Sequence, residues 1–344
     1  MTVSAIGLDI GKNVFHAVAV GRRGKELQRK KLRRKEVLAW FAQHERCLVG
    51  LESCAGSNYW AQQLDALGFE VKLMNPREVC RWRTGMKNDF NDAQACATAA
   101  LQENVRAVAV RSVAQQDMQC LHGMRESAKN ERTALVNQLR GYLLERGISV
   151  AKGIGHFRRQ VPLIVEDAEN ALSDEFRQLL SEGYERVVEL DQRVKGLERR
   201  ISIAGQSNET VKRLREVPGI GPLCSTAIPA WAGDGSQYSN GRGFSANLGV
   251  VPKQYSTGGK VRLGRVSKHG NTYLRYLLIN GARALLTRAG AKAKQGLALQ
   301  RIEQWAVNLG ARRAYNVAVV AIANRLARIV WVVLRGAQYD PAKA

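Results

Sequence analysis

The sequence has 344 residues, of which 45% are hydrophobic and 24% are charged. This composition lets the chain bury a sizeable core and excludes an intrinsically disordered protein. By length it can hold two or three domains. The net charge is +23 and is unevenly placed, because residues 241–344 carry 18 Lys and Arg against 2 Asp and Glu. Such an asymmetric positive field predicts a polyanion partner, which is most often nucleic acid.

Cysteine usage and the apolar segments predict a cytoplasmic protein. The six cysteines are scattered without a C-x-x-C pair, which argues against a disulfide framework or a structural zinc and fits a reducing cytosol. The first residues lack the basic and long apolar parts of a signal peptide. The apolar stretch 315–334 has membrane-spanning length, but Arg325 and Arg328 would each cost about 2.5–3.5 kcal/mol in a bilayer. It is predicted as a buried or partner-packed helix, and no membrane is expected.

The first region, 1–115, reads as a mixed α/β domain. Residues 3–20 form two apolar runs around a Gly-Lys-Asn turn, which predicts a hairpin. A short apolar strand is expected over 47–52, a helix over 57–68, and a further strand over 69–76 that Pro76 stops. Strands that alternate with helices in this way indicate an α/β fold.

The second region, 116–205, is predicted to be all-helical. Apolar residues recur at a 3-4 spacing in two stretches, 118–142 and 176–201, although Arg125 and Arg132 occupy seam positions in the first. Heptad-like helices of this kind predict an antiparallel helical pair or a dimerising coiled coil.

The third region, 206–344, begins with a Pro-Gly-Ile-Gly-Pro turn between two helical stretches. The turn leaves the backbone N–H groups of Gly219 and Gly221 beside a helix N-terminus, where a DNA phosphate can bind. A tight helix–helix turn without a ligand would look the same. A loop-like segment follows that holds Ser256, Thr257 and basic residues suited to phosphate contact. These residues are Lys253, Lys260, Arg262, Arg265 and Lys268.

Four acids lie at chemically useful places in the first region. Asp89 and Asp92 stand three apart at the start of an alanine-rich helix, where acids are also common as capping residues. Asp9 ends the first strand and Glu52 ends the next apolar strand. Acids from strand ends and a helix start can converge, and four clustered carboxylates need a counter-cation. Hard oxygen ligands with room for water predict Mg²⁺.

Several motifs occur in the order in which they occur in the DEDD transposases. They are GLDIGKN, LVGLESCAGSNYW, NPREVCRWRTGMKNDFNDAQA, VPGIGP and NLGVVPKQYSTGGKVRLGRVSKHGN. The chain therefore resembles these bridge-RNA-guided insertion-sequence recombinases, which are related to the pilin-gene invertases. The resemblance implies a RuvC-like, RNase H-type N-terminal domain whose catalytic and metal-binding acids map onto Asp9, Glu52, Asp89 and Asp92. It also implies a helical coiled-coil middle and a helical C-terminal transposase domain with a helix-hairpin-helix.

The same resemblance implies a serine nucleophile and a set of partners. Counting from Pro252 puts Thr257 at the serine position, whereas counting back from Ser267 puts Ser256 there. We favour Ser256 because a primary hydroxyl is less hindered than that of a β-branched threonine. The implied cofactor is Mg²⁺. The implied partners are donor and target DNA, a structured guide RNA, and further copies of the chain in a homodimer to homotetramer.

Three other functions fit parts of the sequence. A junction-resolving nuclease that cuts with metal-activated water would use the same four acids, and the serine would then be structural. GLDIG also resembles the first phosphate loop of actin-like ATPases, but the second loop that those folds need is missing. A non-catalytic basic binder would leave the acid cluster without a purpose.

Overall fold

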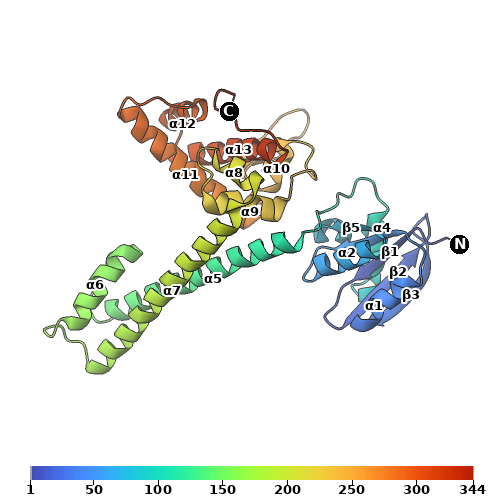
Figure 1. The fold of residues 1–344 in the computed structure, drawn as a ribbon, viewed down its shortest axis with the longest axis horizontal. Helices are drawn as coiled ribbons and strands as arrows, with labels where there is room; N and C mark the ends of the chain where they lie inside the picture. The colour runs from blue at the N-terminus through green and yellow to red at the C-terminus, as the bar shows by residue number, and fades with distance from the viewer. Residues whose placement is uncertain (1, 344) are drawn as a thin grey trace. The chain divides into compact units, whose positions relative to one another are not determined.

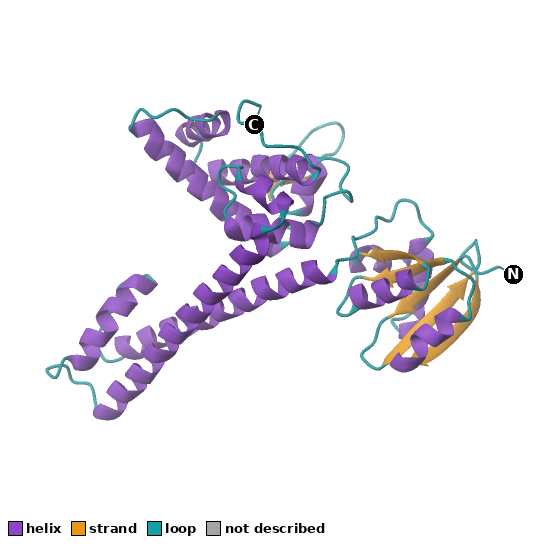
Figure 2. Cartoon of the chain, viewed as in Figure 1, coloured by secondary structure: helices purple, strands orange, loops and turns teal. Residues whose placement is uncertain are grey.

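The computed structural model describes residues 2–343, which form two compact units (Figure 1). Unit 1 holds the residues up to Val113 together with Ser236–Ser239. Unit 2 holds Ala114–Gly235 and the chain from Asn240 onward. Sheet and helices mix in unit 1, whereas unit 2 is almost entirely helical (Figure 2). The division of the helical part into a middle and a C-terminal domain stays a prediction.

Unit 1 is built on a five-stranded sheet in the order β3-β2-β1-β4-β5. The strands are β1 (Ala5–Asp9), β2 (Val14–Val20), β3 (Glu26–Arg33), β4 (Leu48–Glu52) and β5 (Glu70–Met74). The first three strands pair antiparallel, while β4 pairs parallel with both β1 and β5. The mixed α/β domain that the sequence predicts is confirmed.

One face of the sheet carries the main core of unit 1. Side chains alternate between the two faces of a strand, so Ile6, Leu8 and Phe15 all point to the face that α1 (Val37–Ala42) and α2 (Ser57–Ala66) cover. The other buried members of this core are Ala17, Ala19, Leu32, Val37, Trp40, Phe41, Val49, Leu51, Trp60, Ala61, Leu64, Phe69 and Leu73.

Helix α4 (Asp89–Ala100) lies on the opposite face, and two glycines set how close it comes. Gly7 and Gly50 are register partners on β1 and β4. A Cβ on Gly7 would lie 1.9 Å from the carbonyl oxygen of Ala93, and one on Gly50 would lie 2.2 Å from that of Cys96. Only glycine fits so near a helix backbone, and the alanines of α4 allow the same close approach.

Residues 21–46, for which the sequence predicted no element, form β3 and α1. Strand β3 is an edge strand with one buried side chain, Leu32, and four consecutive exposed residues, three of them basic. Charged residues are a common protection of an edge strand, and they also hide its apolar alternation. The remaining short helices of unit 1 are η1 (Arg34–Glu36), α3 (Pro76–Val79) and η2 (Cys80–Trp82).

Two long helices of unit 2, α5 (Val113–Leu144) and α7 (Asp174–Gln206), pack as an antiparallel pair, with α6 (Ile154–Glu166) beside them. The register follows from ion pairs along the seam. Arg125 donates to Glu198 at 2.9 Å, and further along α5 Arg132 pairs with Asp191. The later residue of α5 thus pairs with the earlier residue of α7, which shows that the two helices run in opposite directions. The seam arginines therefore have acids opposite them. The antiparallel pair is confirmed, whereas dimerisation through it stays a prediction.

The rest of unit 2 is a helical bundle with a small hairpin. Its elements are α8 (Glu209–Arg215), α9 (Pro222–Ala232), α10 (Gly241–Asn247), β6 (Pro252–Gln254), β7 (Leu263–Val266), α11 (Thr272–Lys294), α12 (Arg301–Arg312) and α13 (Tyr315–Leu334). Helix α13 packs against α8, α10, α11 and α12. Within the described chain, α13 alone has the length and apolar character to cross a membrane, and half of its most apolar stretch is buried inside the unit.

Candidate functional site

Two parallel strands bring Asp9 and Glu52 to the same end of the sheet. Leu8 on β1 is the register partner of Leu51 on β4, and each strand ends at the acid that follows. Because both strands run in the same direction, their carboxyl ends share one edge. The sheet thus places two carboxylates at one sheet edge.

The start of α4 delivers Asp89 and Asp92 to the sheet. The helix is capped by Asn88, whose side-chain oxygen accepts a hydrogen bond of 2.8 Å from the backbone N–H of Asn91. The capping role that acids often have is therefore filled by another residue. Since the glycines hold α4 close to the sheet, its first turn reaches the carboxyl ends of the strands.

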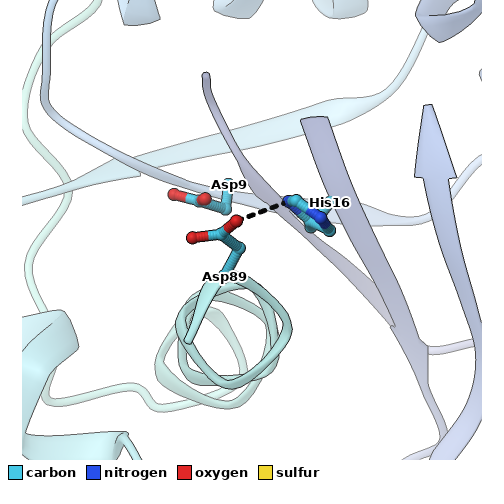
Figure 3. A group of neighbouring side chains, drawn as sticks. All are labelled: Asp9, His16 and Asp89. Atoms are coloured by element: carbon cyan, nitrogen blue, oxygen red, sulfur yellow. Dashed lines mark ion pairs between the residues drawn. The ribbon is translucent and has the colours of Figure 1, made fainter. Parts of the chain in front are cut away.

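A histidine joins the acids at this edge. His16 on β2 is the antiparallel register partner of Asp9, so both side chains rise from the same face of the sheet. Figure 3 shows Asp89 pointing from α4 toward these two residues. Ligand atoms of Asp9, His16 and Asp89 all lie within 4.8 Å of one another. The His16 Nδ1 is 3.4 Å from Asp89 Oδ2. Sequence reasoning missed His16. The expected hairpin turn could have revealed it, because residues equally far from the turn lie opposite each other, and this places His16 opposite Asp9.

The negative charge at this edge is undercompensated. Burial raises the pKa of Asp9 most, and the charges of Asp89, Asp92 and Glu52 raise it further, to about 6. All four acids therefore interact electrostatically through Asp9. Burial and the three nearby acids both oppose ionisation of Asp9, and a bound cation would favour its charged form.

The Glu52 side of the cluster contains basic residues. Arg83 donates a hydrogen bond of 3.1 Å to Asp92 Oδ1. Burial and then Asp92 raise the pKa of Glu52, while Lys87 and Arg83 oppose that rise. Sequence reasoning did not single out Arg83 or Lys87, because a lone basic residue in a loop has no spacing signal. Of the four predicted acids, Asp9 and Asp89 thus belong to the tightest group of ligand atoms, and Glu52 and Asp92 lie outside it.

The donor set fits a divalent metal ion. Carboxylate oxygens are the hard ligands that Mg²⁺ and Mn²⁺ prefer, and an imidazole nitrogen is acceptable to transition metals. Burial raises the pKa of Asp9 most, and three neighbouring carboxylates raise it further, so a bound cation would meet several negative charges here.

Ser256 and Thr257 lie in unit 2, in the exposed loop between β6 and β7. The side-chain amide of Gln254 donates to Ser256 Oγ at 2.9 Å. The N–H of Lys260 donates to the Thr257 carbonyl at 3.1 Å across residues 258–259, whose φ values are 57° and 75°. Positive φ at both central positions favours a Gly-Gly turn, which explains the glycines. The hairpin presents both hydroxyl-bearing residues to solvent.

The basic residues around this hairpin are free to meet an anion. None of them forms an ion pair with an acid within residues 2–343. The exposed residues are Lys253, Lys260, Arg262, Arg265 and Lys268. Beside the hairpin a groove of 1270 Å³ runs along α13. Its charged lining residues are all basic: Arg242, Arg265, Arg325, Arg328 and Lys343.

The turn between α8 and α9 has two glycines in different surroundings. Gly219 has φ 89°, and a Cβ there would lie 2.8 Å from the carbonyl oxygen of Gly281 on α11. This contact with α11 therefore requires glycine at position 219. Gly221 is exposed, precedes Pro222 at the start of α9, and has open space where a Cβ would stand, with no atom within 4 Å apart from its own and those of its chain neighbours. Phosphate contact at this turn stays a prediction, and Gly221 is the more accessible of the two.

Two families match different parts of the chain. Residues 6–147, which include the whole acid cluster, match a family described as transposases. Residues 211–297, which include the β6–β7 hairpin, match the family described as Transposase IS116/IS110/IS902. With a carboxylate cluster on a mixed sheet and a basic helical unit, the chain is a DNA transposase, an enzyme that recombines DNA.

Named relatives span nearly all of the chain. A protein of Pseudomonas aeruginosa named "Probable family 20 transposase" is 39% identical over 97% of each chain. The transposase for insertion sequence element IS1328 of Yersinia enterocolitica is 36% identical over 96% of each. The transposase for IS1111A of Coxiella burnetii is 34% identical over 96% of this chain and 90% of that protein. The chain belongs to the IS116/IS110/IS902 family of insertion-sequence transposases. A DEDD-type transposase domain also indicates a divalent metal ion at the acid cluster.

Proposed function

We propose that unit 1 is a RuvC-like, RNase H-type domain in which Asp9, Glu52, Asp89 and Asp92 hold Mg²⁺. The observation that carries this proposal is the coupling of the other three acids to Asp9, whose pKa rises to about 6. The strand order, with an antiparallel β1–β2–β3 meander followed by parallel β4 and β5, supports the fold. The bound ion would polarise the scissile phosphodiester and stabilise its developing negative charge.

Ser256 is the nucleophile in this proposal. Its Oγ forms an ester bond with the phosphorus, the bond from phosphorus to one deoxyribose oxygen breaks, and the serine proton ends on that released oxygen. The support is that Ser256 lies exposed on a turn-defined hairpin among basic residues without acid partners. A serine alcohol is weak at neutral pH and needs activation, and no histidine is its hydrogen-bond partner within residues 2–343. In this proposal the acid cluster of another subunit would supply that activation.

The basic surfaces of unit 2 hold the nucleic acids. Lys253, Lys260, Arg262, Arg265 and Lys268 neutralise phosphates, which makes binding fall steeply with salt. The α8–α9 turn acts as a helix-hairpin-helix at the DNA backbone. A structured guide RNA selects the donor and target DNA by base pairing, so the protein reads mainly backbone and shape.

Copies of the chain assemble as a homodimer to homotetramer, so that acids of one subunit meet Ser256 of another. A groove of 640 Å³ on the α5–α7 pair supports a further helix packing there. It contains Met124, which is 47% exposed, and Leu121. The enzyme acts in the cytoplasm on the bacterial nucleoid.

The test uses supercoiled donor DNA, the guide transcript and the full-length protein. Asp89→Asn and Ser256→Ala should each abolish excision, while Asp65→Asn, an exposed aspartate on α2 of the same unit, should retain it. Wild-type protein on a nicked substrate should give a covalent DNA adduct that Ser256→Ala lacks.

Two results would redirect the proposal. Cleavage by Ser256→Ala without an adduct would favour the junction nuclease that uses water. An adduct that survives in Ser256→Ala and disappears in Thr257→Ala would move the nucleophile by one residue.

A further inference from the structure

His16 is a buried imidazole that the proposed mechanism leaves unused. Its side chain is 10% exposed, and its ring packs edge-on against Phe90 with centroids 4.7 Å apart. Its polar contact within residues 2–343 is the Nδ1 approach to Asp89. A buried polar side chain normally has a hydrogen-bond partner, so the direction in which this one points needs a reason.

The separation of 3.4 Å between His16 Nδ1 and Asp89 Oδ2 is informative. It exceeds the length of an ordinary N–H···O hydrogen bond, which is about 2.7–3.2 Å. Two donor atoms that share one cation at bonds of about 2.1 Å lie roughly 3 Å apart at right angles and about 4.2 Å apart when opposite. The group formed by Asp9, His16 and Asp89, with ligand atoms inside 4.8 Å, needs only a small contraction to reach that range.

Cross-strand register makes this placement a property of the fold. His16 is opposite Asp9 on an antiparallel pair, and the neighbouring Phe15 faces the apolar core. The side chain of His16 can therefore rise only on the face where α4 brings Asp89. The structure combines two carboxylates and one imidazole from three separate elements, β1, β2 and α4.

We propose that His16 Nδ1 is a direct ligand of the divalent ion, together with Asp9 and Asp89. The inference rests on the proposed metal site and adds a nitrogen donor to a set of acids. Coordination through Nδ1 leaves the ring proton on Nε2. Because imidazole suits transition metals better than Mg²⁺, the Asp89 side of the site binds Co²⁺ and Mn²⁺ more tightly than four carboxylates alone would.

The test is pulsed electron paramagnetic resonance of Mn²⁺ added to the full-length protein. Wild type should show the ¹⁴N modulation of a coordinated imidazole. His16→Gln should lose it while still binding Mn²⁺, because the amide offers an oxygen in place of nitrogen. His44→Gln is the matched control on the same unit, since the ring nitrogens of His44 contact Trp40 and Gln28 and no acid within residues 2–343, and it should keep the modulation.

Calorimetry supplies a second readout. His16→Gln should lower Co²⁺ affinity by at least about tenfold and should change Mg²⁺ affinity less. Loss of a residue that only supports a metal ligand already lowers metal affinity by about tenfold or more, so loss of a direct ligand should cost at least that much. Asp9→Asn should weaken the binding of both ions. Thermal melting of each variant without metal shows whether it is folded.

The outcomes separate this inference from the proposed metal site. Mn²⁺ binding that depends on Asp9 but carries no imidazole ¹⁴N modulation in wild type would overturn the ligand role of His16 and leave the acid site standing. Absence of Asp9-dependent binding in wild type would overturn both. The wild-type spectrum decides even if His16→Gln fails to fold.

Discussion

Replacing Asp9 by asparagine should stabilise the metal-free protein. The pKa of this carboxyl rises from 3.8 to about 6 in the folded state, mainly through burial and then through Asp89, Asp92 and Glu52. A shift of about two pKa units corresponds to roughly 3 kcal/mol at about 1.4 kcal/mol per unit. Because Asp9 is only partly buried, solvent screening reduces the expected effect to about 1 kcal/mol.

The sign follows from proton binding. Below pH 3.8 both folded and unfolded Asp9 are protonated, and the group contributes nothing. Between that pH and about 6 the folded state keeps a proton that the unfolded state has lost, so stability falls as pH rises. Above that window the full cost is present, and Asp9→Asn removes it. The advantage of Asp9→Asn should therefore be largest at pH 7–8 and vanish near pH 3.5.

Urea unfolding with a chelator present, at several pH values, measures this difference. Asp65→Asn on α2 controls for a simple loss of charge and should show little pH-dependent gain. With saturating Mg²⁺ the order should reverse, because the ion stabilises the wild-type fold by mass action and binds the asparagine variant poorly. If Asp9→Asn is no more stable than wild type at pH 8 without metal, the reasoning about undercompensated charge is wrong.

Three further predictions concern packing, DNA contact and the helical pair. Gly7→Ala should destabilise unit 1 by about 3 kcal/mol, since the new Cβ would overlap a carbonyl of α4. Its control is Gly123→Ala on the open face of α5, which should be neutral or stabilise by up to about 1 kcal/mol. Urea unfolding measures both differences. The double change Lys260→Gln and Arg262→Gln should reduce the slope of log K against log salt by about 2 in DNA-binding titrations. Asp191→Asn should lower the free energy of unfolding by about 3 kcal/mol, because two arginines lose their buried acid partner. Thermal unfolding measures this loss.

The strands and the helix that carry the acids could be read from the sequence because their patterns are local. The apolar runs over 3–20 and 47–52 have the length and β-branched content of buried strands, and the structure places β1, β2 and β4 there. The alternation that would reveal β3 is hidden by charges at its exposed edge. Helix α6 lies within the region that the sequence predicts to be helical, but its bounds were not predicted, because it packs outside the seam that the 3-4 spacing marks.

The arrangement of the site depends on features that one sequence does not display. The close approach of α4 rests on Gly7 and Gly50 meeting across two strands, and a lone glycine in a strand pattern can equally mark a bulge. His16 could have been found, because the two-residue period and the turn fix its register with Asp9. Arg83 could not, since its pairing with Asp92 depends on how an irregular loop folds.

A Mn²⁺-soaked crystal of the full-length protein, measured at the manganese absorption edge, tests the metal site most directly. The account predicts an anomalous density peak within bonding distance of Asp9 and Asp89, with His16 Nδ1 as a third ligand. A transposase that needs a divalent ion for DNA cleavage, yet shows no peak beside Asp9 under the same conditions, would contradict it.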